Sequence, residues 1–286
     1  MTQIFRYRQK GASSSVFVGK HASQRVSNGQ LFKRYAPLTA NSDPRRIDLK
    51  ASVLDPFEQY QIRTYQQHSL LDVYLLADFS TSFRFVGQDS KPQILEELFL
   101  SIAYSALAVG DYFAFIGIGQ KFDKRYFLPA NRHSGRIESF RKNLHETPNN
   151  TGLDSLLEIA PYLSKRRSLI FLLSDFHVEL SALPKLLHSL KHHDVVPIVL
   201  WDKKEYEQLP SWGLVTFQDM ETRTTRTLFM RPKLRANIEN AYQKRRQNLQ
   251  NSLRALGYEP LFLTSAPLTQ QRSPVRPRSW LRASRY

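Results

Sequence analysis

Three short segments of this sequence carry oxygen-bearing side chains that could form one metal site. They are Asp78-Phe79-Ser80-Thr81-Ser82, the lone Thr151, and Asp175, which follows Ser174. Carboxylate and hydroxyl oxygens are the ligands that a hard cation such as Mg²⁺ prefers. We therefore predict a Mg²⁺ site, with Mn²⁺ and Ca²⁺ as the alternative cations. Its five ligands are Asp78, Ser80, Ser82, Thr151 and Asp175.

The spacing within the first segment suits a shared cation. Asp78, Ser80 and Ser82 are two residues apart, so an extended loop can turn all three side chains toward one point. Neutral hydroxyls from Ser80, Ser82 and Thr151 leave the charge of a divalent cation incompletely neutralised. An acidic group of a partner would complete the ligand shell, which makes the metal a docking point. The competing interpretation is that these residues only cap helices or form turns.

Buried strands must position these segments if they are to meet. Residues 72–77 and 169–173 are compact apolar runs typical of central strands, and Asp78 and Asp175 follow them closely. Thr151 stands at the start of a predicted helix. Because ligands bind at the carboxyl ends of the strands in a doubly wound sheet, we expect all three segments at the same edge.

Strands alternate with helices along most of the chain, which predicts an α/β fold: a doubly wound, mostly parallel sheet with helices on both faces. We expect an N-terminal extension with short strands that packs on the core (1–70), an α/β domain (71–265) and a disordered basic tail (266–286). Further strands are predicted over 58–66, 112–118, 125–128, 195–200 and 260–263. Helices are predicted over 91–109, 134–145, 152–164, 181–192 and 232–256.

Composition narrows the class of protein. The 286 residues contain no cysteine, which excludes disulfides, thiolate zinc sites and cysteine nucleophiles, and fits a reducing compartment. No apolar run approaches the ~18 residues that span a bilayer, and the N-terminus lacks the apolar region of a signal peptide. We expect a cytoplasmic protein without an integral membrane segment, and peripheral association with the inner membrane is the alternative.

The net charge of +16 is concentrated near the C-terminus, where residues 231–286 hold 12 Lys and Arg against two Glu. A basic helix and tail could bind nucleic acid. Aromatic residues for base stacking are sparse there, so we do not expect a nucleic-acid partner. The preferred interpretation is a charged, solvated helix that steers the protein toward an acidic partner.

Three further residues are candidates for contact with a partner protein. Arg45 and Arg46 lie in a charged segment before the sheet; the preferred interpretation is a salt-bridged connection that packs the N-terminal segment onto the core, and a partner surface is the alternative. His177 lies two residues after Asp175 and therefore close to the predicted metal site. A metal-dependent hydrolase using the same oxygen ligands is an alternative function, although the sequence offers no clear general base for it.

The metal motif resembles the metal-ion-dependent adhesion site of von Willebrand factor A domains. In that site an Asp-x-Ser-x-Ser motif, a Thr entering a helix and a strand-terminal Ser-Asp occur together. Upstream, Asp43-Pro44-Arg45-Arg46-Ile47-Asp48 is similar to the segment that precedes this domain in the domain-of-unknown-function 58 family. Leu49 stands where that family usually has Trp, and Asn149-Asn150 where it has Gly-Gly.

The resemblance covers residues 20–265 and implies a von Willebrand A-like domain over residues 71–265. Members of this family are typically encoded beside MoxR-type AAA+ ATPases, and one branch accompanies methanol dehydrogenase operons. The resemblance therefore implies a non-enzymatic adaptor or co-chaperone. Its implied partners are such an ATPase and a client protein, in protein or metallo-enzyme maturation.

Overall fold

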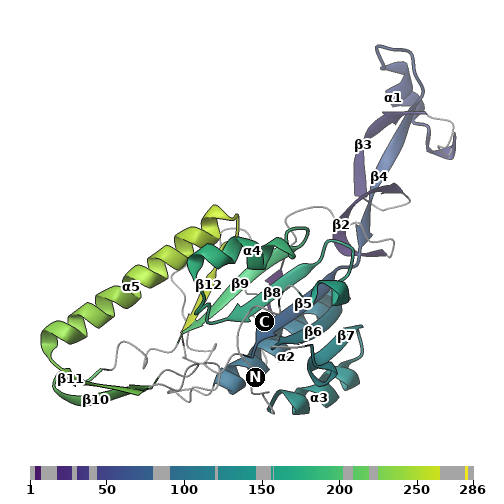
Figure 1. Cartoon of the computed structure of the whole chain (residues 1–286). Helices are drawn as coiled ribbons and strands as arrows, with labels where there is room; N and C mark the ends of the chain where they lie inside the picture. Colours follow the sequence, from purple (N-terminus) through teal and green to yellow (C-terminus); the bar gives the residue numbers. More distant parts are fainter. Residues whose placement is uncertain are drawn as a thin grey trace. The chain divides into compact units, whose positions relative to one another are not determined.

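The structure is a computed structural model that divides into two compact units, residues 8–71 and residues 1–7 with 72–286 (Figure 1). The expected packing of residues 1–70 on the core stays a prediction. The residues that the structure describes are 4–7, 18–27, 31–38, 44–79, 91–119, 122–145, 156, 158–201, 209–218, 225–264 and 281–282.

The larger unit is built around a six-stranded sheet of order β12-β9-β8-β5-β6-β7 (Figure 1). Its strands are β5 (Asp72–Asp78), β6 (Tyr112–Ile118), β7 (Phe127–Asn131), β8 (Leu169–Ser174), β9 (Asp194–Trp201) and β12 (Leu261–Thr264). Only β7 is antiparallel to its neighbour. The chain runs from β5 outward to β7, then returns to β8 and runs outward to β12, so the strand order reverses between β5 and β8. This confirms the predicted doubly wound, mostly parallel sheet.

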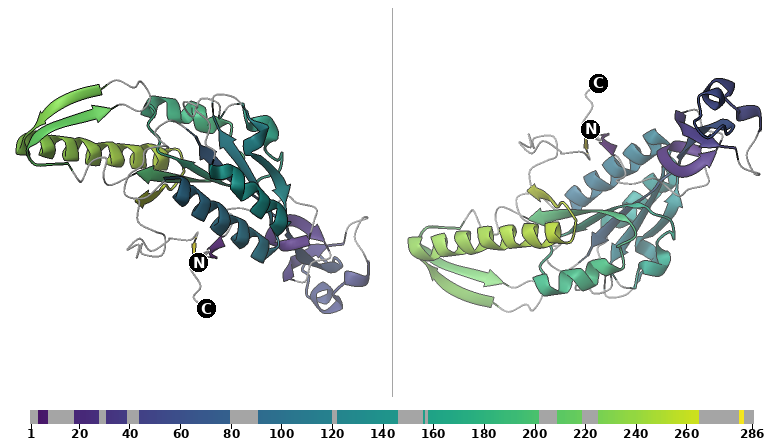
Figure 2. Two further views of the ribbon diagram at one scale, coloured as in Figure 1. Left: turned by 90° about the horizontal axis from the view of Figure 1, so that it is seen from below. Right: turned by 90° about the horizontal axis from the view of Figure 1, so that it is seen from above.

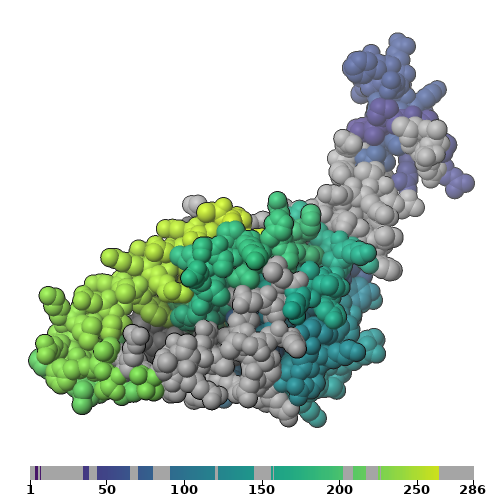
Figure 3. All heavy atoms as spheres, in the orientation of Figure 1, coloured from purple at the N-terminus to yellow at the C-terminus, as the bar shows by residue number. Residues whose placement is uncertain are grey.

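Successive side chains of the central strands point to opposite faces, and helices cover both. On one face, Phe113 and Phe115 of β6 contact Phe99 of α2 (Lys91–Val109), with ring centroids 5.2 and 5.5 Å apart. Phe140 of α3 (Ser134–Arg141) stacks on the same Phe99. The intervening residues of β6 face a second core with α4 (Leu183–His188) and α5 (Pro232–Ala255). Figure 2 shows α2 and α5 from two further sides, and α4 and α5 adjoin in Figure 3.

Helix α2 is the one described helix that is long and apolar enough to cross a membrane. Its Leu95, Phe99, Ala103 and Ala106 are fully buried inside the protein. A core helix of a globular domain meets the same criteria of length and composition, so these criteria do not make α2 a membrane span.

Most predicted helices and strands of the larger unit are present, but several differ from the prediction in length or in helix type. The predicted helix 181–192 is 3₁₀ η7 (Leu180–Ala182) followed by the short α4, and 134–145 is α3 followed by η4 (Lys142–His145). Within 152–164, the described part contains η6 (Ala160–Tyr162), a 3₁₀ turn around Pro161, which cannot donate a helical hydrogen bond. The strand predicted over 125–128 begins later, after η3 (Lys124–Tyr126).

Two strand pairings of the larger unit were not predicted. Strands β10 (Gly213–Gln218) and β11 (Thr225–Met230) form an antiparallel hairpin before α5, with Leu214 opposite Phe229. Strand β1 (Arg6–Tyr7) pairs with β13 (Leu281–Arg282), so two residues of the tail expected to be disordered are ordered. The rest of that tail lies outside the described residues.

Tyr7 of β1 is tied to the fully buried Asp111, to which its hydroxyl donates a hydrogen bond. Burial, followed by the neighbouring carboxylate, raises the pKa of Tyr7. Below the ordinary tyrosine pKa of about 10 both folded and unfolded states keep the phenol proton. Above it the unfolded state loses the proton first, so the stability that Tyr7 contributes declines as the pH rises.

We expect Tyr7→Phe to lower the free energy of unfolding by about 1–3 kcal/mol at neutral pH, because Asp111 loses a buried donor. The variant should also lose less stability than the wild type between about pH 9 and pH 11. Urea unfolding at several pH values measures both effects, with the exposed Tyr60 replaced by Phe as control. If the free energy of unfolding falls equally with pH in wild type and Tyr7→Phe, the buried Tyr7–Asp111 hydrogen bond is not the cause of the pH dependence.

The smaller unit is a three-stranded antiparallel sheet of order β2-β4-β3. Its elements are β2 (Val18–Ser27), β3 (Leu31–Pro37), η1 (Pro44–Arg46), α1 (Leu49–Val53) and β4 (Gln61–Ser69). The strand predicted over 58–66 begins three residues later as β4. Glu58, with φ of 55°, belongs to a turn instead, and its N–H donates to the Asp55 carbonyl.

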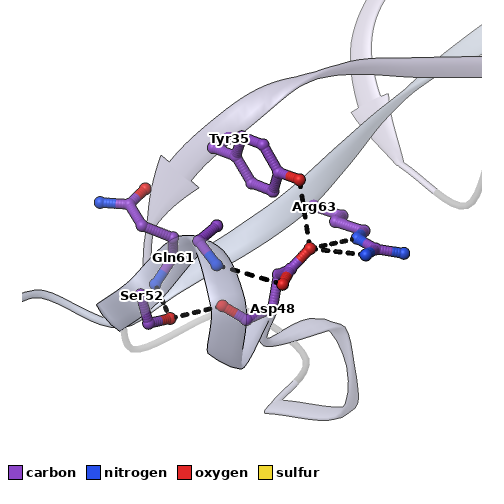
Figure 4. Close-up of polar contacts among 6 residues, drawn as sticks. Tyr35, Asp48, Ser52, Gln61 and Arg63 are labelled. Carbon is purple, nitrogen blue, oxygen red and sulfur yellow. Dashed lines mark hydrogen bonds and ion pairs between the residues drawn. The ribbon is translucent and has the colours of Figure 1, made fainter. Parts of the chain in front are cut away.

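Asp48 holds the segment between β3 and β4 in place (Figure 4). Its Oδ2 accepts from Arg63 Nε at 2.7 Å, pairs with Arg63 Nη2 at 2.6 Å, and accepts from the Tyr35 hydroxyl at 3.1 Å. Its Oδ1 accepts the Ala51 N–H at 3.2 Å, which caps the N-terminus of α1. The hydrogen bond from Arg63 is the main cause of the lowered pKa of Asp48, followed by the Ala51 N–H.

A lowered pKa means that Asp48 stabilises the fold above about pH 4 and that this contribution is lost as the pH falls. We expect Asp48→Asn to speed amide hydrogen exchange in residues 44–63 at neutral pH, because the ion pair to Arg63 is lost. The difference from wild type should shrink on acidification, once intrinsic exchange rates are corrected for. Asp55→Asn is the control, since its side chain accepts only an exposed backbone bond from Gln59 among the bonds described.

Candidate metal centre at the carboxyl edge of the sheet

The structure brings two of the predicted ligands, Asp78 and Asp175, to one edge of the sheet. Asp78 is the last residue of β5, and Asp175 directly follows β8. These strands are parallel neighbours with Ala77 opposite Leu173, and they flank the point where the strand order reverses. Both carboxylates are buried, with 2% and 3% of the residue exposed. Ligand sites in doubly wound sheets occur at this position.

Ser174 links the two strands at this edge. Its hydroxyl donates to Asp78 Oδ2 at 2.8 Å and accepts the backbone N–H of Phe176 at 2.9 Å. The serine therefore fixes one oxygen of the Asp78 carboxylate and the start of the loop that carries Asp175. A serine at the end of a strand, one residue before an aspartate, was the sequence signal for this contact.

The turn that carries Asp175 is held in an uncommon backbone conformation. Phe176 has φ of 52°, in the left-handed region that costs a non-glycine residue about 1–3 kcal/mol. Its side chain is buried in the core, which offsets that cost. Asp175 Oδ1 accepts the His177 N–H at 3.2 Å, and the Asp175 carbonyl accepts from Trp201 Nε1 at 2.7 Å.

The sequence did not single out Trp201 as part of this site. Its indole is buried at the end of β9, with ring centroids 4.8 Å from Tyr242 of α5 and 5.7 Å from Phe262 of β12. Arg245 Nη2 also donates to the Val178 carbonyl at 3.3 Å. Helix α5 thus packs against Trp201 through Tyr242 and against the Asp175 turn through Arg245. The only signal was a Trp at the carboxyl end of a predicted strand.

Phe79 anchors the chain beyond Asp78. Its N–H donates to the Ile118 carbonyl at 2.9 Å, which extends the β5–β6 pairing past the carboxylate. Its buried ring lies 5.1 Å from the Tyr126 ring and 6.3 Å from the Phe115 ring, measured between centroids. The direction in which the chain leaves Asp78 is therefore fixed. The remaining predicted ligands, Ser80, Ser82 and Thr151, lie outside the described residues.

The described donors fit a hard cation. Two carboxylates in a buried position favour a compensating positive charge, and oxygen ligands are those of Mg²⁺. Within the part of the chain that the structure describes, no group of three His, Asp or Glu residues could hold a metal. A complete site here would thus need the hydroxyl ligands predicted from the sequence in addition to Asp78 and Asp175.

The other predicted contact residues lie in different places. His177 is exposed beside Asp175, with its ring centroid 6.2 Å from that of Trp201. Arg45 and Arg46 lie in η1 of the smaller unit. Basic side chains of α5 pair within the protein: Arg246 lies over the Phe262 ring, and Arg254 pairs with Glu259.

The sheet order and the acidic residues at its carboxyl edge define a von Willebrand A-like α/β domain. The chain belongs to the DUF58 family, whose model, described as "Protein of unknown function DUF58", matches residues 42–248. The family expected from the sequence is therefore confirmed.

Similar solved structures have low sequence identity. The conserved hypothetical protein BatB from Bacteroides thetaiotaomicron is 12% identical over 68% of this chain and 91% of that chain, with a TM-score of 0.38. An aerotolerance-related membrane protein from Bacteroides fragilis has the same identity and coverage, with a TM-score of 0.39. The VWA domain of SpRpn10 is 13% identical over 69% and 90% of the two chains, with a TM-score of 0.39. These scores are low, so the fold assignment rests on the strand order. No curated protein matches the chain.

Proposed function

We propose that this protein is a non-enzymatic, metal-dependent module for protein–protein interaction. The observation that carries the proposal is the buried pair Asp78 and Asp175 on neighbouring strand ends, with the Ser174 hydroxyl bonded to Asp78 and to the Phe176 N–H of the Asp175 turn. In this role it acts as an adaptor or co-chaperone with a MoxR-type AAA+ ATPase in the maturation of a client protein or metallo-enzyme. The ATPase partnership rests on membership of the DUF58 family.

Asp78 and Asp175 would hold Mg²⁺ directly or through water, together with the hydroxyls of Ser80, Ser82 and Thr151. The bound ion supplies an electrophilic centre for an anionic group. Ser174 orients the Asp78 carboxylate, and Trp201 fixes the Asp175 turn, so both ligands are held before a partner arrives. A carboxylate of the partner would complete the ligand shell, and His177 is exposed close to Asp175.

A binding role is supported by the hydrogen bonds that the Asp78 and Asp175 carboxylates accept. Asp78 accepts from a serine hydroxyl and Asp175 from a backbone N–H, and these contacts hold the groups still. A hydrolase would instead need a base poised to remove a proton from water. If the purified protein hydrolyses phosphoesters with Mg²⁺ and Asp78→Ala abolishes this activity, the non-enzymatic proposal is contradicted. The protein would then be a metal-dependent hydrolase.

Affinity purification from the native cell tests the proposed partnership. We expect an AAA+ ATPase, identified by mass spectrometry, to co-purify with wild type in Mg²⁺ and to be lost with EDTA. Asp78→Asn and Ser80→Ala/Ser82→Ala should lose it in Mg²⁺ as well. The matched control is Asp194→Asn, which removes a carboxylate at the opposite edge of the sheet, where it pairs with the half-exposed Arg167. Equal recovery with Asp78→Asn and wild type would show that docking does not use the metal.

A further inference from the structure

The smaller unit presents a cluster of exposed apolar side chains on α1 and the turn that follows it. We call this cluster the apolar tip. Its members and exposed fractions are Leu49 (69%), Val53 (85%), Leu54 (81%), Phe57 (79%) and Tyr60 (60%). Single exposed apolar residues are ordinary, whereas five of them on one short segment are typical of an interaction surface.

The backbone beneath the apolar tip is held by specific hydrogen bonds. Ser52 Oγ donates to the Asp48 carbonyl at 2.7 Å and accepts the Gln61 N–H at 2.8 Å (Figure 4). The Leu38 N–H donates to the Tyr60 carbonyl at 2.8 Å, which closes the base of the segment. The apolar side chains are thus presented on a fixed support, and a partner would meet a pre-organised surface.

We propose that the apolar tip is the interface at which a second copy of this chain binds, forming a two-fold dimer. An aromatic residue buries ~150–250 Å² when it is covered. The five side chains of the apolar tip therefore supply a substantial share of the ~800 Å² per partner of a standard interface. A second copy covers both apolar tips at once, so neither remains in water.

Charges around the apolar tip favour a second copy over a partner of one charge sign. Arg45 and Lys50 lie at or before the start of α1, whereas Asp55 and Glu58 follow its end. A two-fold axis perpendicular to α1 makes the two copies of the helix antiparallel, so the start of one lies against the end of the other. Basic residues of each copy then face acidic residues of its partner, which fixes the relative orientation. Arg45 and Arg46 are candidates from the sequence for contact with a partner, and in this arrangement they would belong to the charged residues around the apolar tip.

This dimer is independent of the metal centre, because all of its residues belong to the smaller unit. Sedimentation equilibrium of the whole 286-residue chain in EDTA tests it without contribution from Mg²⁺. We expect a monomer–dimer equilibrium that Leu54→Ser/Phe57→Ser weakens by at least tenfold in Kd, a loss typical of central interface residues. Leu214→Ser, a comparably exposed leucine of the β10–β11 hairpin, should leave the Kd unchanged.

A charge-exchange experiment tests the proposed two-fold arrangement. Lys50→Glu alone and Glu58→Lys alone should each weaken self-association, since each variant opposes like charges across the axis. Mixing the two variants should restore association, because position 50 of one copy then carries a charge opposite to position 58 of the other at both contacts. Circular dichroism of each variant confirms that the fold is intact.

Two results would overturn the proposal. One is a wild-type monomer at every concentration up to about 1 mM, where a specific interface of this size would be populated. The other is a dimer whose Kd is the same in Leu54→Ser/Phe57→Ser as in wild type. If the monomer binds phosphatidylglycerol vesicles and this double variant does not, the apolar tip binds a lipid surface in place of a second copy.

Discussion

Replacing Asp78 by Asn is expected to abolish the stabilisation of this protein by Mg²⁺. A ligand that binds only the folded state, present at 100 times its Kd, adds about 2.7 kcal/mol to the free energy of unfolding. The wild type should show this gain. Asp78→Asn should show almost none, because a neutral amide is a far weaker ligand for a hard cation than a carboxylate.

The same substitution separates a metal ligand from a purely structural aspartate. The amide oxygen of Asn is placed like a carboxylate oxygen and can still accept the Ser174 hydroxyl bond. Without metal, two buried carboxylates on neighbouring strands repel each other, so Asp78→Asn in EDTA should be as stable as wild type or more stable. A structural role for Asp78 predicts a loss of stability in EDTA as well.

Urea unfolding of wild type, Asp78→Asn and Asp194→Asn, each with Mg²⁺ and with EDTA, measures these differences. Asp194→Asn should retain the full Mg²⁺ effect, because its carboxylate begins β9 at the amino end of the sheet. If Mg²⁺ raises the free energy of unfolding equally in all three proteins, the ion does not bind at Asp78.

Gly117→Ala is expected to destabilise the protein by about 1–3 kcal/mol or more, the usual range for overpacking a core. Gly117 lies opposite Ala77 in the β5–β6 pair. A Cβ atom at this position would stand 2.2 Å from Phe79 Cε2 and 2.7 Å from Tyr126 Cβ. Real atoms never approach so closely, so the Phe79 ring and the neighbouring backbone must move.

The displacement would act on the metal centre as well as on stability. Phe79 is the residue after Asp78 and leads directly into the Ser80 and Ser82 segment. A shifted Phe79 therefore misplaces the predicted hydroxyl ligands, and we expect weaker Mg²⁺ stabilisation in the folded Gly117→Ala protein. The control is Gly135→Ala in α3, where the added Cβ meets nothing within 4 Å. Alanine is the better helix former there, so that variant should be neutral or more stable by up to ~1 kcal/mol.

A double-mutant cycle assigns the cost of Gly117→Ala to the aromatic ring. Phe79→Leu removes the atoms nearest to the added Cβ, so Gly117→Ala should cost at least about 0.5 kcal/mol less in a Phe79→Leu background. Additive effects of the two substitutions would show that the clash with Tyr126 or the backbone dominates. Thermal and urea unfolding of the four proteins give the required free energies.

The central strands were predictable from sequence because they are buried on both faces. The runs 72–77 and 169–173 are uniformly apolar, and only strands of a sheet covered by helices on both sides require this. The same runs located Asp78 and Asp175 at strand ends. Because strands alternate with helices along the chain, the strands were expected to be parallel, which places both carboxyl ends at one edge of the sheet. The fold class and these two site positions therefore follow from local pattern and simple topology.

Elements with a weak sequence pattern, or with contacts between residues distant in sequence, were not predictable in the same way. The β10–β11 hairpin has exposed faces of mixed composition, so its strands lack a clear alternation. The Asp48 network depends on Tyr35 and Arg63, which come from two different strands. Similarly, the role of Trp201 depends on β9 lying beside β8.

By itself, the sequence determined the doubly wound α/β class, the DUF58 family and the placement of two carboxylates after buried strands. Each of these depends on residue type and spacing along the chain. Only the tertiary structure decided that Ser174 joins Asp78 to the Asp175 turn, that Trp201 fixes this turn, and that Leu54 and Phe57 face solvent. The physical reason is that hydrogen bonds and burial are set by neighbours in space, and chain spacing does not encode those neighbours.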